Sequence, residues 1–131
     1  MRVNVFVVED SAAMRQRLIA ALEEVPGARV VGWAEGADEA MTAITCLRPR
    51  LVVLDLRLAL GSGLSVLEGI KRIEAPPVVA ILTNYPHAPY RARCAELGAD
   101  YFFDKAAGLD GLMDACRAIV AGGSGAASRG R

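Results

Sequence analysis

The amino-acid sequence predicts an α/β protein built on a doubly wound, five-stranded parallel sheet. Five strand-like segments alternate with five segments whose apolar residues recur at helical spacing, a pattern typical of a parallel sheet with helices on both faces. The strand-like segments are almost continuously apolar, as expected for strands that are buried on both sides. Because crossovers between parallel strands are right-handed, this order of elements restricts the topology to a doubly wound sheet.

The strands are predicted from short β-branched runs, and the helices from apolar residues three or four positions apart. The expected strands lie at about residues 3–8, 29–34, 51–54, 78–82 and 101–103. The expected helices lie at about residues 12–24, 35–48, 64–73, 90–97 and 110–120. Ser11 offers an N-cap to the first helix, and Pro49 stops the second. Pro86 and Pro89 bracket the start of the fourth helix, and Gly98 ends it.

Length and composition indicate one domain, residues 1–121, followed by a Gly/Ser-rich tail, residues 122–131, that we expect to be flexible. Lys and Arg together number 15 and balance 15 Asp and Glu, so the charge gives no basis for nucleic-acid binding. No apolar run approaches the roughly 18 residues of a membrane span, and the start does not resemble a leader peptide. We therefore expect a cytoplasmic protein without membrane contact and without a second domain for output.

The three cysteines, Cys46, Cys94 and Cys116, are widely spaced and form no CxxC pair. Each lies in a partly apolar, helical segment, so we expect small buried thiols rather than a disulfide framework or a zinc site. Free thiols fit a reducing compartment.

Polar side chains gather where the predicted strands end. Glu9 and Asp10 follow the first strand, and Asp55 follows the third. Thr83 ends the fourth strand, and Lys105 follows the fifth. The carboxyl ends of parallel strands share one edge of the sheet, and doubly wound sheets bind their ligands at that edge. We therefore expect these five side chains to form one site.

The acidic residues of this site indicate a Mg²⁺ centre. Clustered carboxylates repel one another, so at least one of them is expected to have a raised pKa. A hard divalent cation relieves this repulsion, and Mg²⁺ prefers a few carboxylates together with waters and a phosphate oxygen. We expect Asp10 and Asp55 to be direct ligands and Glu9 to act directly or through water. The backbone carbonyl of Arg57 can add a further ligand.

Phosphoryl transfer depends mostly on positioning the reactants and neutralising charge, and the same site has side chains for both tasks. Asp55 keeps its second oxygen available to attack phosphorus. Lys105 supplies a positive charge, and Thr83 can hydrogen-bond a phosphoryl oxygen without adding charge. These residues predict that Asp55 accepts a phosphoryl group.

The chain resembles a bacterial response-regulator receiver domain over about residues 3–120, and the features that match are Glu9-Asp10, Asp55, Gly63 in the following loop, Thr83 and Lys105. The resemblance implies a flavodoxin-like (βα)5 fold with strand order 2-1-3-4-5. It also implies that a sensor histidine kinase or a histidine phosphotransfer protein donates the phosphoryl group from phosphohistidine. Such a domain catalyses only its own phosphorylation and dephosphorylation.

The resemblance further implies a switch. Thr83 would move toward the phosphoryl group, and Phe102, at the family's aromatic position, would rotate inward behind it. Alternation along the strand places Phe102 on the opposite face from Tyr101 and Phe103. The surface of the fourth helix, fifth strand and fifth helix would then contact a downstream protein, or a second copy of the chain after phosphorylation. A plain core aromatic is the alternative interpretation of Phe102.

The chain departs from the family pattern near the site. Ala106 follows Lys105 where the family usually has proline after a cis peptide, and a non-proline cis bond costs about 2.5–4 kcal/mol. This bond can therefore be trans and present Lys105 differently. Asn84 stands where a smaller residue is commoner. Arg57 and Tyr85 flank the site at positions that tune the lifetime of the phosphoryl group.

Three other functions are compatible with parts of this sequence pattern. The chain can be the receiver part of a longer DNA-binding transcription factor. A flavodoxin-like nucleotide- or flavin-binding domain would need a phosphate-cradling loop after the first strand, where Glu9 and Asp10 repel phosphate. A phosphatase with Asp55 as its nucleophile would need a general acid two residues further on, where Arg57 stands.

Overall fold

The computed structural model describes residues 2–84 and 86–122, and within them five strands alternate with five α-helices. The strands are β1 (Val3–Val8), β2 (Ala28–Ala34), β3 (Leu51–Leu54), β4 (Val78–Thr83) and β5 (Tyr101–Asp104). The helices are α1 (Ala12–Glu23), α2 (Ala37–Leu47), α3 (Gly63–Ile70), α4 (Ala88–Glu96) and α5 (Asp110–Val120). A 3₁₀ turn, η1 (Lys105–Ala107), precedes α5.

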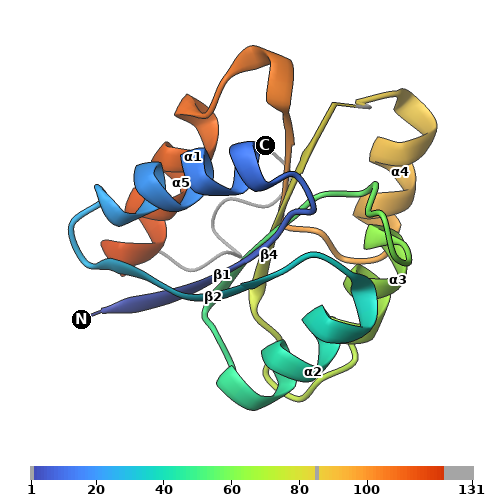
Figure 1. The fold of residues 1–131 in the computed structure, drawn as a ribbon, viewed down its shortest axis with the longest axis horizontal. Helices are drawn as coiled ribbons and strands as arrows, with labels where there is room; N and C mark the ends of the chain where they lie inside the picture. Colours follow the sequence, from blue (N-terminus) through green and yellow to red (C-terminus); the bar gives the residue numbers. More distant parts are fainter. Residues whose placement is uncertain (1, 85, 123–131) are drawn as a thin grey trace.

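All five strands are parallel and lie in the order β2-β1-β3-β4-β5, which confirms the predicted fold class and strand order (Figure 1). Helices α1 and α5 cover one face of the sheet, and α2, α3 and α4 cover the other. Alternation divides the side chains of β1 between the two layers. Val5 and Val7 pack with α1 and α5, whereas Phe6 and Val8 pack with the opposite helices. Every residue of β3 and β4 is buried, as expected for central strands covered on both sides.

The helix ends follow local chemistry and differ from the predicted bounds by a few residues. Ser11 caps α1 as predicted, because its hydroxyl accepts a hydrogen bond from a backbone N–H of the first turn. Helix α3 ends at Ile70 rather than at Ile73, although Ile73 still packs against the core. Helix α4 begins earlier than predicted, at Ala88, because Pro89 fits the first turn of a helix, where its missing N–H is not needed.

The described elements end at Val120, within the predicted domain of residues 1–121. Of the predicted tail, residues 122–131, only Gly122 belongs to the described residues, and 123–131 lie outside them. In the part of the chain that the structure describes, no helix combines the length and the apolar character needed to cross a membrane.

The prediction that all three cysteines are buried is wrong for Cys46. Cys94 and Cys116 are buried, but Cys46 is exposed. The buried stripe of α2 consists of Ala37, Ala40 and Ile44, and Cys46 falls outside it. Burial raises the pKa of the Cys94 thiol to about 11, and burial also raises the pKa of the Cys116 thiol.

These environments predict unequal thiol reactivity. In the native protein at mildly alkaline pH, we expect one thiol, that of Cys46, to react rapidly with the aromatic disulfide DTNB, because the reacting species is an accessible thiolate. All three thiols should react after denaturation. Replacing Cys46 with serine should remove the rapid phase, and a rapid phase that survives this replacement would contradict the burial of Cys94 and Cys116.

Candidate functional site

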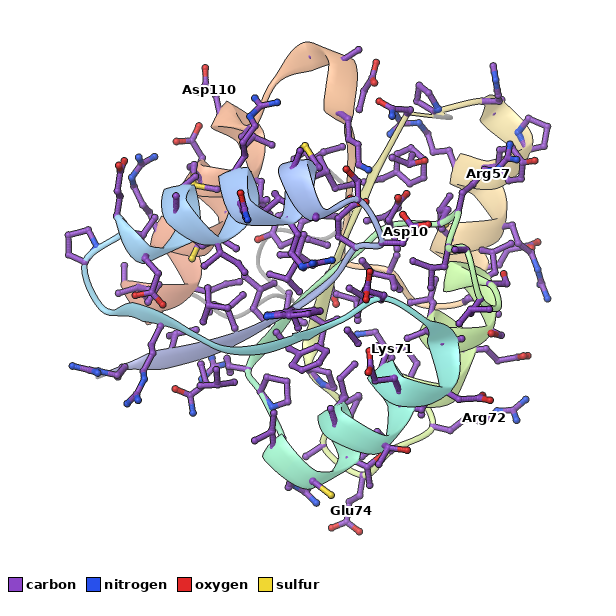
Figure 2. All side chains as sticks on the ribbon, viewed as in Figure 1. Asp10, Arg57, Lys71, Arg72, Glu74 and Asp110 are labelled. Carbon is purple, nitrogen blue, oxygen red and sulfur yellow. The ribbon has the colours of Figure 1, made fainter. Side chains whose placement is uncertain are left out.

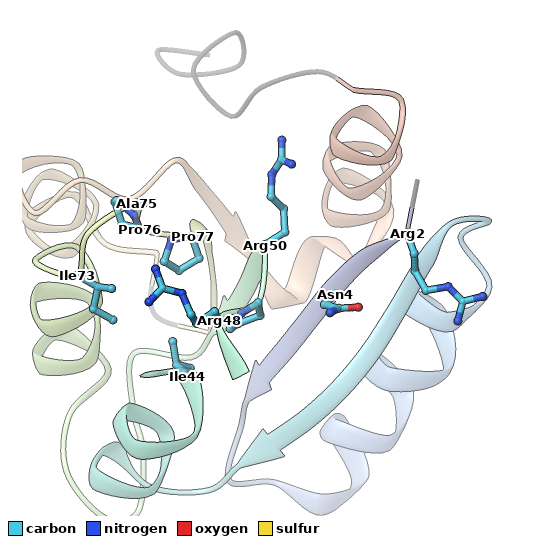
Figure 3. A pocket seen from close by; sticks show the side chains of 10 residues that line it. Arg2, Asn4, Ile44, Arg48, Arg50, Ile73, Ala75, Pro76 and Pro77 are labelled. Atoms are coloured by element: carbon cyan, nitrogen blue, oxygen red, sulfur yellow. The ribbon is translucent and has the colours of Figure 1, made fainter. Parts of the chain in front are cut away.

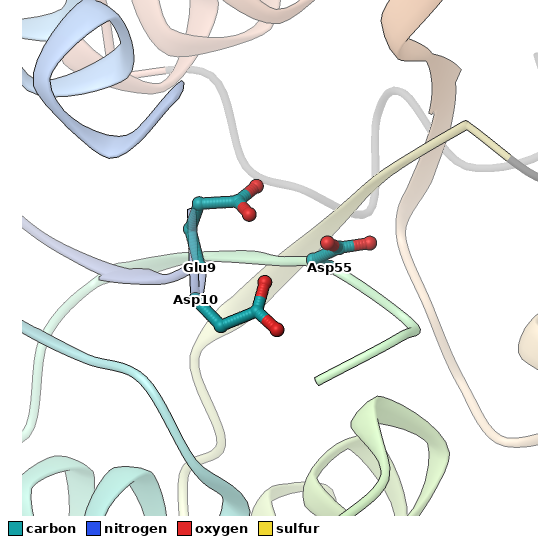
Figure 4. Close-up of side chains that lie close together, drawn as sticks. All are labelled: Glu9, Asp10 and Asp55. Carbon is teal, nitrogen blue, oxygen red and sulfur yellow. The ribbon is translucent and has the colours of Figure 1, made fainter. Parts of the chain in front are cut away.

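The ends of β1 and β3 bring three carboxylates together. The backbone N–H of Asp55 donates to the Val8 carbonyl at 3.1 Å, so the two strand ends lie level with each other. One carboxylate oxygen from each of Glu9, Asp10 and Asp55 lies within 4.8 Å of the others. We call these three residues the acidic cluster, and Figure 4 shows the Glu9 and Asp10 side chains extending toward the side on which Asp55 lies. The structure therefore confirms that these residues meet at one edge of the sheet.

Lys105 lies against the acidic cluster, as predicted. Its Nζ is 2.6 Å from Glu9 Oε1 and 3.0 Å from Asp55 Oδ2. The peptide bond to Ala106 is trans, since no described peptide bond is cis. The Asp104 carboxylate accepts a hydrogen bond from the Ala106 N–H at 2.9 Å and caps the 3₁₀ turn η1. This side-chain cap, and not a proline, shapes the backbone from which Lys105 reaches the cluster.

Burial and neighbouring charges shift the pKa values of Glu9 and Lys105. Burial raises the pKa of Glu9, and the charge of Asp55 adds to this effect, while Lys105 and the Ser11 N–H act in the opposite direction. A raised carboxylate pKa is what the sequence predicted. Burial alone would lower the pKa of Lys105, but contact with Glu9 and Asp55 outweighs it, so the pKa is raised and the ammonium form is favoured. When all three carboxylates are ionised, the single ammonium leaves two of their negative charges uncompensated.

The acidic cluster fits Mg²⁺. All of its donor atoms are carboxylate oxygens, the ligand type that this cation prefers. Glu9 Oε1 is buried and makes a close ion pair with Lys105 Nζ at 2.6 Å, so a buried carboxylate oxygen is already presented beside a cation in this site. Asp10 is half-buried and the most exposed of the three, so water can reach it, and Mg²⁺ usually keeps several waters. The two uncompensated charges match a divalent cation.

The loop after β3 folds back over Asp55. The Gly63 N–H donates to the Leu56 carbonyl at 3.0 Å, and a Cβ atom at Gly63 would collide with the carbonyl oxygen of Asp55. Glycine is therefore needed for this loop to close. The Arg57 N–H lies 3.4 Å from Asp55 Oδ1, and Figure 2 shows Arg57 on the α4 side of the loop. The role of the Arg57 carbonyl as a metal ligand stays a prediction.

Thr83 and Phe102 lie where the sequence placed them. Thr83 is the last residue of β4, is buried, and is paired in register with Asp104. Phe102 packs with the α2–α4 layer, whereas Tyr101 and Phe103 stack on each other on the opposite face, with ring centroids 5.8 Å apart. The predicted alternation is confirmed, and the movement of Thr83 and Phe102 stays a prediction.

Two arginines near the site were not found from the sequence. The guanidinium of Arg15 donates to the Glu9 carbonyl at 3.0 Å, and the Arg91 guanidinium lies 4.4 Å from the centroid of the Phe102 ring. Arg15 precedes Leu18 and Leu22 by three and seven residues, on the buried stripe of α1. A charged residue on a core-facing stripe was therefore the signal for Arg15. The mostly exposed helix α4 offers no comparable signal for Arg91.

The cavity in Figure 3 lies at the opposite edge of the sheet from the acidic cluster. Its volume is about 300 Å³, and Asn4, Arg48, Arg50 and Pro77 are among the residues that line it. None of the predicted site residues belongs to it. A cavity of about 260 Å³ between the β3–α3 loop and α4 does border the site, because Arg57 lines it. Donor atoms, rather than cavity volume, therefore define the functional site.

Comparison with known proteins agrees with this geometry. The family model of the response regulator receiver domain matches residues 5–117, and the chain belongs to this family. Over 121 residues it is 38% identical to a protein-glutamate methylesterase/protein-glutamine glutaminase of Caulobacter vibrioides, with 92% of this chain and 35% of that protein covered. It is 28% identical to the response regulator GacA of Pseudomonas protegens, with 92% of this chain and 56% of GacA covered. The chain thus spans between about a third and just over half of these relatives.

Solved structures show the same fold. A LuxR-family two-component response regulator from Aurantimonas sp. has a TM-score of 0.85 and 26% identity, covering 95% of this chain and 89% of that one. The response regulator domain of CheB from Thermotoga maritima has a TM-score of 0.84 and 23% identity, covering 92% and 98%. The phosphorylated cyanobacterial phytochrome response regulator RcpA has a TM-score of 0.77 and 25% identity, covering 91% of each chain. Receiver domains of two-component signalling therefore share this architecture.

Proposed function

We propose that this chain is a phosphoryl-accepting switch of a two-component system or phosphorelay, phosphorylated on Asp55 in the presence of Mg²⁺. The observation that carries the proposal is the position of Asp55 in a cluster of three carboxylates, with the Lys105 ammonium 3.0 Å from its Oδ2. Membership of the receiver family and the phosphorylated state of the relative RcpA support it.

The geometry suggests how each group acts. An oxygen of the Asp55 carboxylate attacks the phosphorus of a phosphohistidine; the new P–O bond forms as the P–N bond breaks, and the released imidazole takes up a proton. Lys105, already beside Asp55 Oδ2, stays next to the transferred oxygens and offsets their charge. Thr83 supplies a hydroxyl from the neighbouring strand end. A Mg²⁺ ion held by the acidic cluster would neutralise charge on the phosphoryl oxygens.

The partners follow from this chemistry. A sensor histidine kinase or a histidine phosphotransfer protein would donate the phosphoryl group. The output would be contact with a downstream protein through α4, β5 and α5, or pairing of two phosphorylated copies. The half-buried Phe102 ring lies between this surface and the core and could transmit the change. A cytoplasmic location and the absence of other catalysis stay predictions.

The proposal is tested by incubating the protein with a small phosphodonor such as acetyl phosphate and recording its intact mass. With Mg²⁺ present, we expect a gain of one phosphoryl group; with EDTA in place of Mg²⁺, we expect almost none. Equal gain in both conditions would reject the metal dependence. No gain with Mg²⁺ would reject the function.

The lengths of the relatives favour a second form of output, in which the receiver acts on a domain attached to it. GacA continues well beyond the matched region, and the Aurantimonas neighbour is a LuxR-family regulator. This receiver can therefore act on an attached DNA-binding domain instead of a separate protein. The mass of the protein produced from its native gene distinguishes the two: a mass near the 13.8 kDa of this chain would exclude an attached domain.

Arg57 offers a prediction about the lifetime of the phosphorylated state. Its backbone N–H faces Asp55 Oδ1, and its side chain is exposed at the entrance from the α4 side. Arg57→Ala should change the rate of phosphoryl loss several-fold without preventing phosphorylation, because the residue controls the approach of water and not the acceptor itself. Decay of the phosphoprotein mass measures this rate, and unchanged decay would contradict the role. Tyr85, assigned the same role from the sequence, lies outside the described residues.

A further inference from the structure

Arg15 is a buried cation that the phosphoryl chemistry does not use. The residue is 9% exposed, and arginine is rarely buried to this extent without partners. Among the described residues, its hydrogen-bond, ion-pair and ring partners are Glu9, Glu35 and Trp33. Its Nη1 donates to the Glu9 carbonyl at 3.0 Å and lies 3.7 Å from Glu35 Oε2, while its guanidinium lies 3.8 Å from the centre of the Trp33 ring. The Glu35 side chain is 54% exposed, so this ion pair is weak, and the carbonyl and the ring are the main partners.

Arg15 binds the carbonyl of Glu9, which lies within the acidic cluster's own backbone. It belongs to the peptide unit between Glu9 and Asp10, whose side chains are two of the three in the acidic cluster. A peptide unit is planar, so the direction of its oxygen sets the orientation of the whole unit and thereby restricts the directions in which both side chains leave the backbone. The Glu9 N–H is already held by the Ala34 carbonyl at 3.0 Å. Arg15 therefore supplies the second hydrogen bond to the Glu9 backbone, at its carbonyl.

Trp33 holds Arg15 in place. It lies on the edge strand β2, paired in register with Val7, and its ring covers the planar guanidinium. Stacking of this kind restricts a long side chain to one orientation and suits arginine better than lysine. Trp33 is 46% exposed as a residue, so its ring contacts Arg15 while solvent reaches part of the residue. Trp33 is also the only tryptophan in the sequence.

We propose that Arg15, held by the Trp33 ring, is a positioning residue that orients the Glu9–Asp10 peptide and thereby sets the geometry of the acidic cluster for a divalent cation. The inference rests on the proposed function, because it assigns a role toward the same metal site. If the inference holds, the exposed residue Trp33 is linked to the metal site through the Arg15 side chain.

Whether loss of Arg15 strengthens or weakens Mg²⁺ binding distinguishes an effect of its charge from an effect of positioning. If its charge were what mattered, the guanidinium would repel a cation, and its removal would strengthen Mg²⁺ binding. If positioning matters, its removal loosens the Glu9–Asp10 peptide and weakens binding. Arg15→Met keeps much of the length and apolar stem but loses both charge and hydrogen bond. Arg15→Gln loses the charge and keeps a hydrogen-bond donor.

The first test is a calorimetric titration of wild type and both variants with Mg²⁺. We expect Arg15→Met to lower the affinity about tenfold and Arg15→Gln to recover part of that loss. Unchanged or increased affinity in Arg15→Met, with wild type binding Mg²⁺ normally, would overturn the positioning role and leave the proposed function intact. Failure of wild type to bind Mg²⁺ would instead reject the metal-dependent function, and the positioning role with it.

A second test needs no metal and guards against a general loss of folding. The Ser11 N–H donates to Glu9 Oε2 at 3.1 Å and reports the order of this turn. Its hydrogen exchange should be faster in Arg15→Met, while amides of β3 and β4 keep wild-type rates. Equal Ser11 exchange in both proteins would overturn the role, as would a uniform increase throughout the sheet, which indicates a structural effect only. Trp33→Phe keeps an aromatic platform and should resemble wild type, whereas Trp33→Ala should resemble Arg15→Met.

Discussion

Replacing Asp55 with asparagine is expected to abolish phosphoryl uptake from a small phosphodonor. The amide has nearly the shape of the carboxylate, but it lacks the negatively charged oxygen that attacks phosphorus. The loss also removes one ligand from the acidic cluster and one of the two carboxylates that contact Lys105. Mg²⁺ affinity should therefore fall together with phosphorylation. Intact mass after incubation with donor and Mg²⁺ measures the first effect, and calorimetry measures the second.

Asp110 provides the matched control. It is an exposed carboxylate in the first turn of α5 and does not belong to the acidic cluster. Asp110→Asn makes the same chemical change at a distance from the cluster (Figure 2) and should gain phosphoryl mass as wild type does. If Asp55→Asn gained as much phosphoryl mass as Asp110→Asn, Asp55 would not be the acceptor.

The largest loss of stability is expected from Asp100→Ala. The Asp100 side chain is fully buried, and its Oδ2 accepts hydrogen bonds from Lys71 Nζ at 2.8 Å and from the Val79 N–H at 2.9 Å. Lys71 Nζ also donates to the Pro77 carbonyl, so this pair joins α3 to the starts of β4 and β5. The variant leaves a largely buried ammonium and a backbone N–H without this partner. We expect a cost of about 3 kcal/mol and a Tm roughly 10 °C lower.

An exposed ion pair in the same region serves as the comparison. Glu68 lies on α3 and Arg72 follows the end of this helix; Glu68 Oε2 and Arg72 Nη2 are 3.3 Å apart, and the two side chains are 45% and 77% exposed. Because solvent screens such a pair, Glu68→Ala should cost less than about 1 kcal/mol. Thermal unfolding of the two variants should therefore give clearly different Tm values. Similar values would show that the Asp100–Lys71 pair contributes no more than a surface pair.

Much of the fold and of the acidic cluster could be predicted because both depend on regular spacing. Alternation along β5 was enough to separate Phe102 from Tyr101 and Phe103, and parallel strands necessarily bring the residues after β1 and β3 to the same edge. Repulsion among clustered carboxylates was enough to predict a raised carboxylate pKa; the pKa of Glu9 is indeed raised, but mainly by burial, with the charge of Asp55 as a smaller cause.

What could not be predicted depends on three-dimensional contacts between residues of different elements. The backbone around Lys105 is shaped by a cap from Asp104, and the absence of proline at Ala106 says nothing about such a cap. The contact of Arg15 with both the Glu9 carbonyl and Trp33 requires α1 to be placed against β1 and β2. Cys46 was misjudged because its helix is partly apolar, although its position falls outside the buried stripe.

The most direct test of the central claim locates the phosphoryl group on the chain. Wild-type protein is phosphorylated with a small donor and Mg²⁺ and then treated with borohydride, which reduces an aspartyl phosphate to homoserine. Peptide mass mapping identifies the reduced residue. We expect homoserine at Asp55 and at no other acidic residue, with none in protein that received no donor. Homoserine at another position, or none in protein that had gained phosphoryl mass, would contradict it.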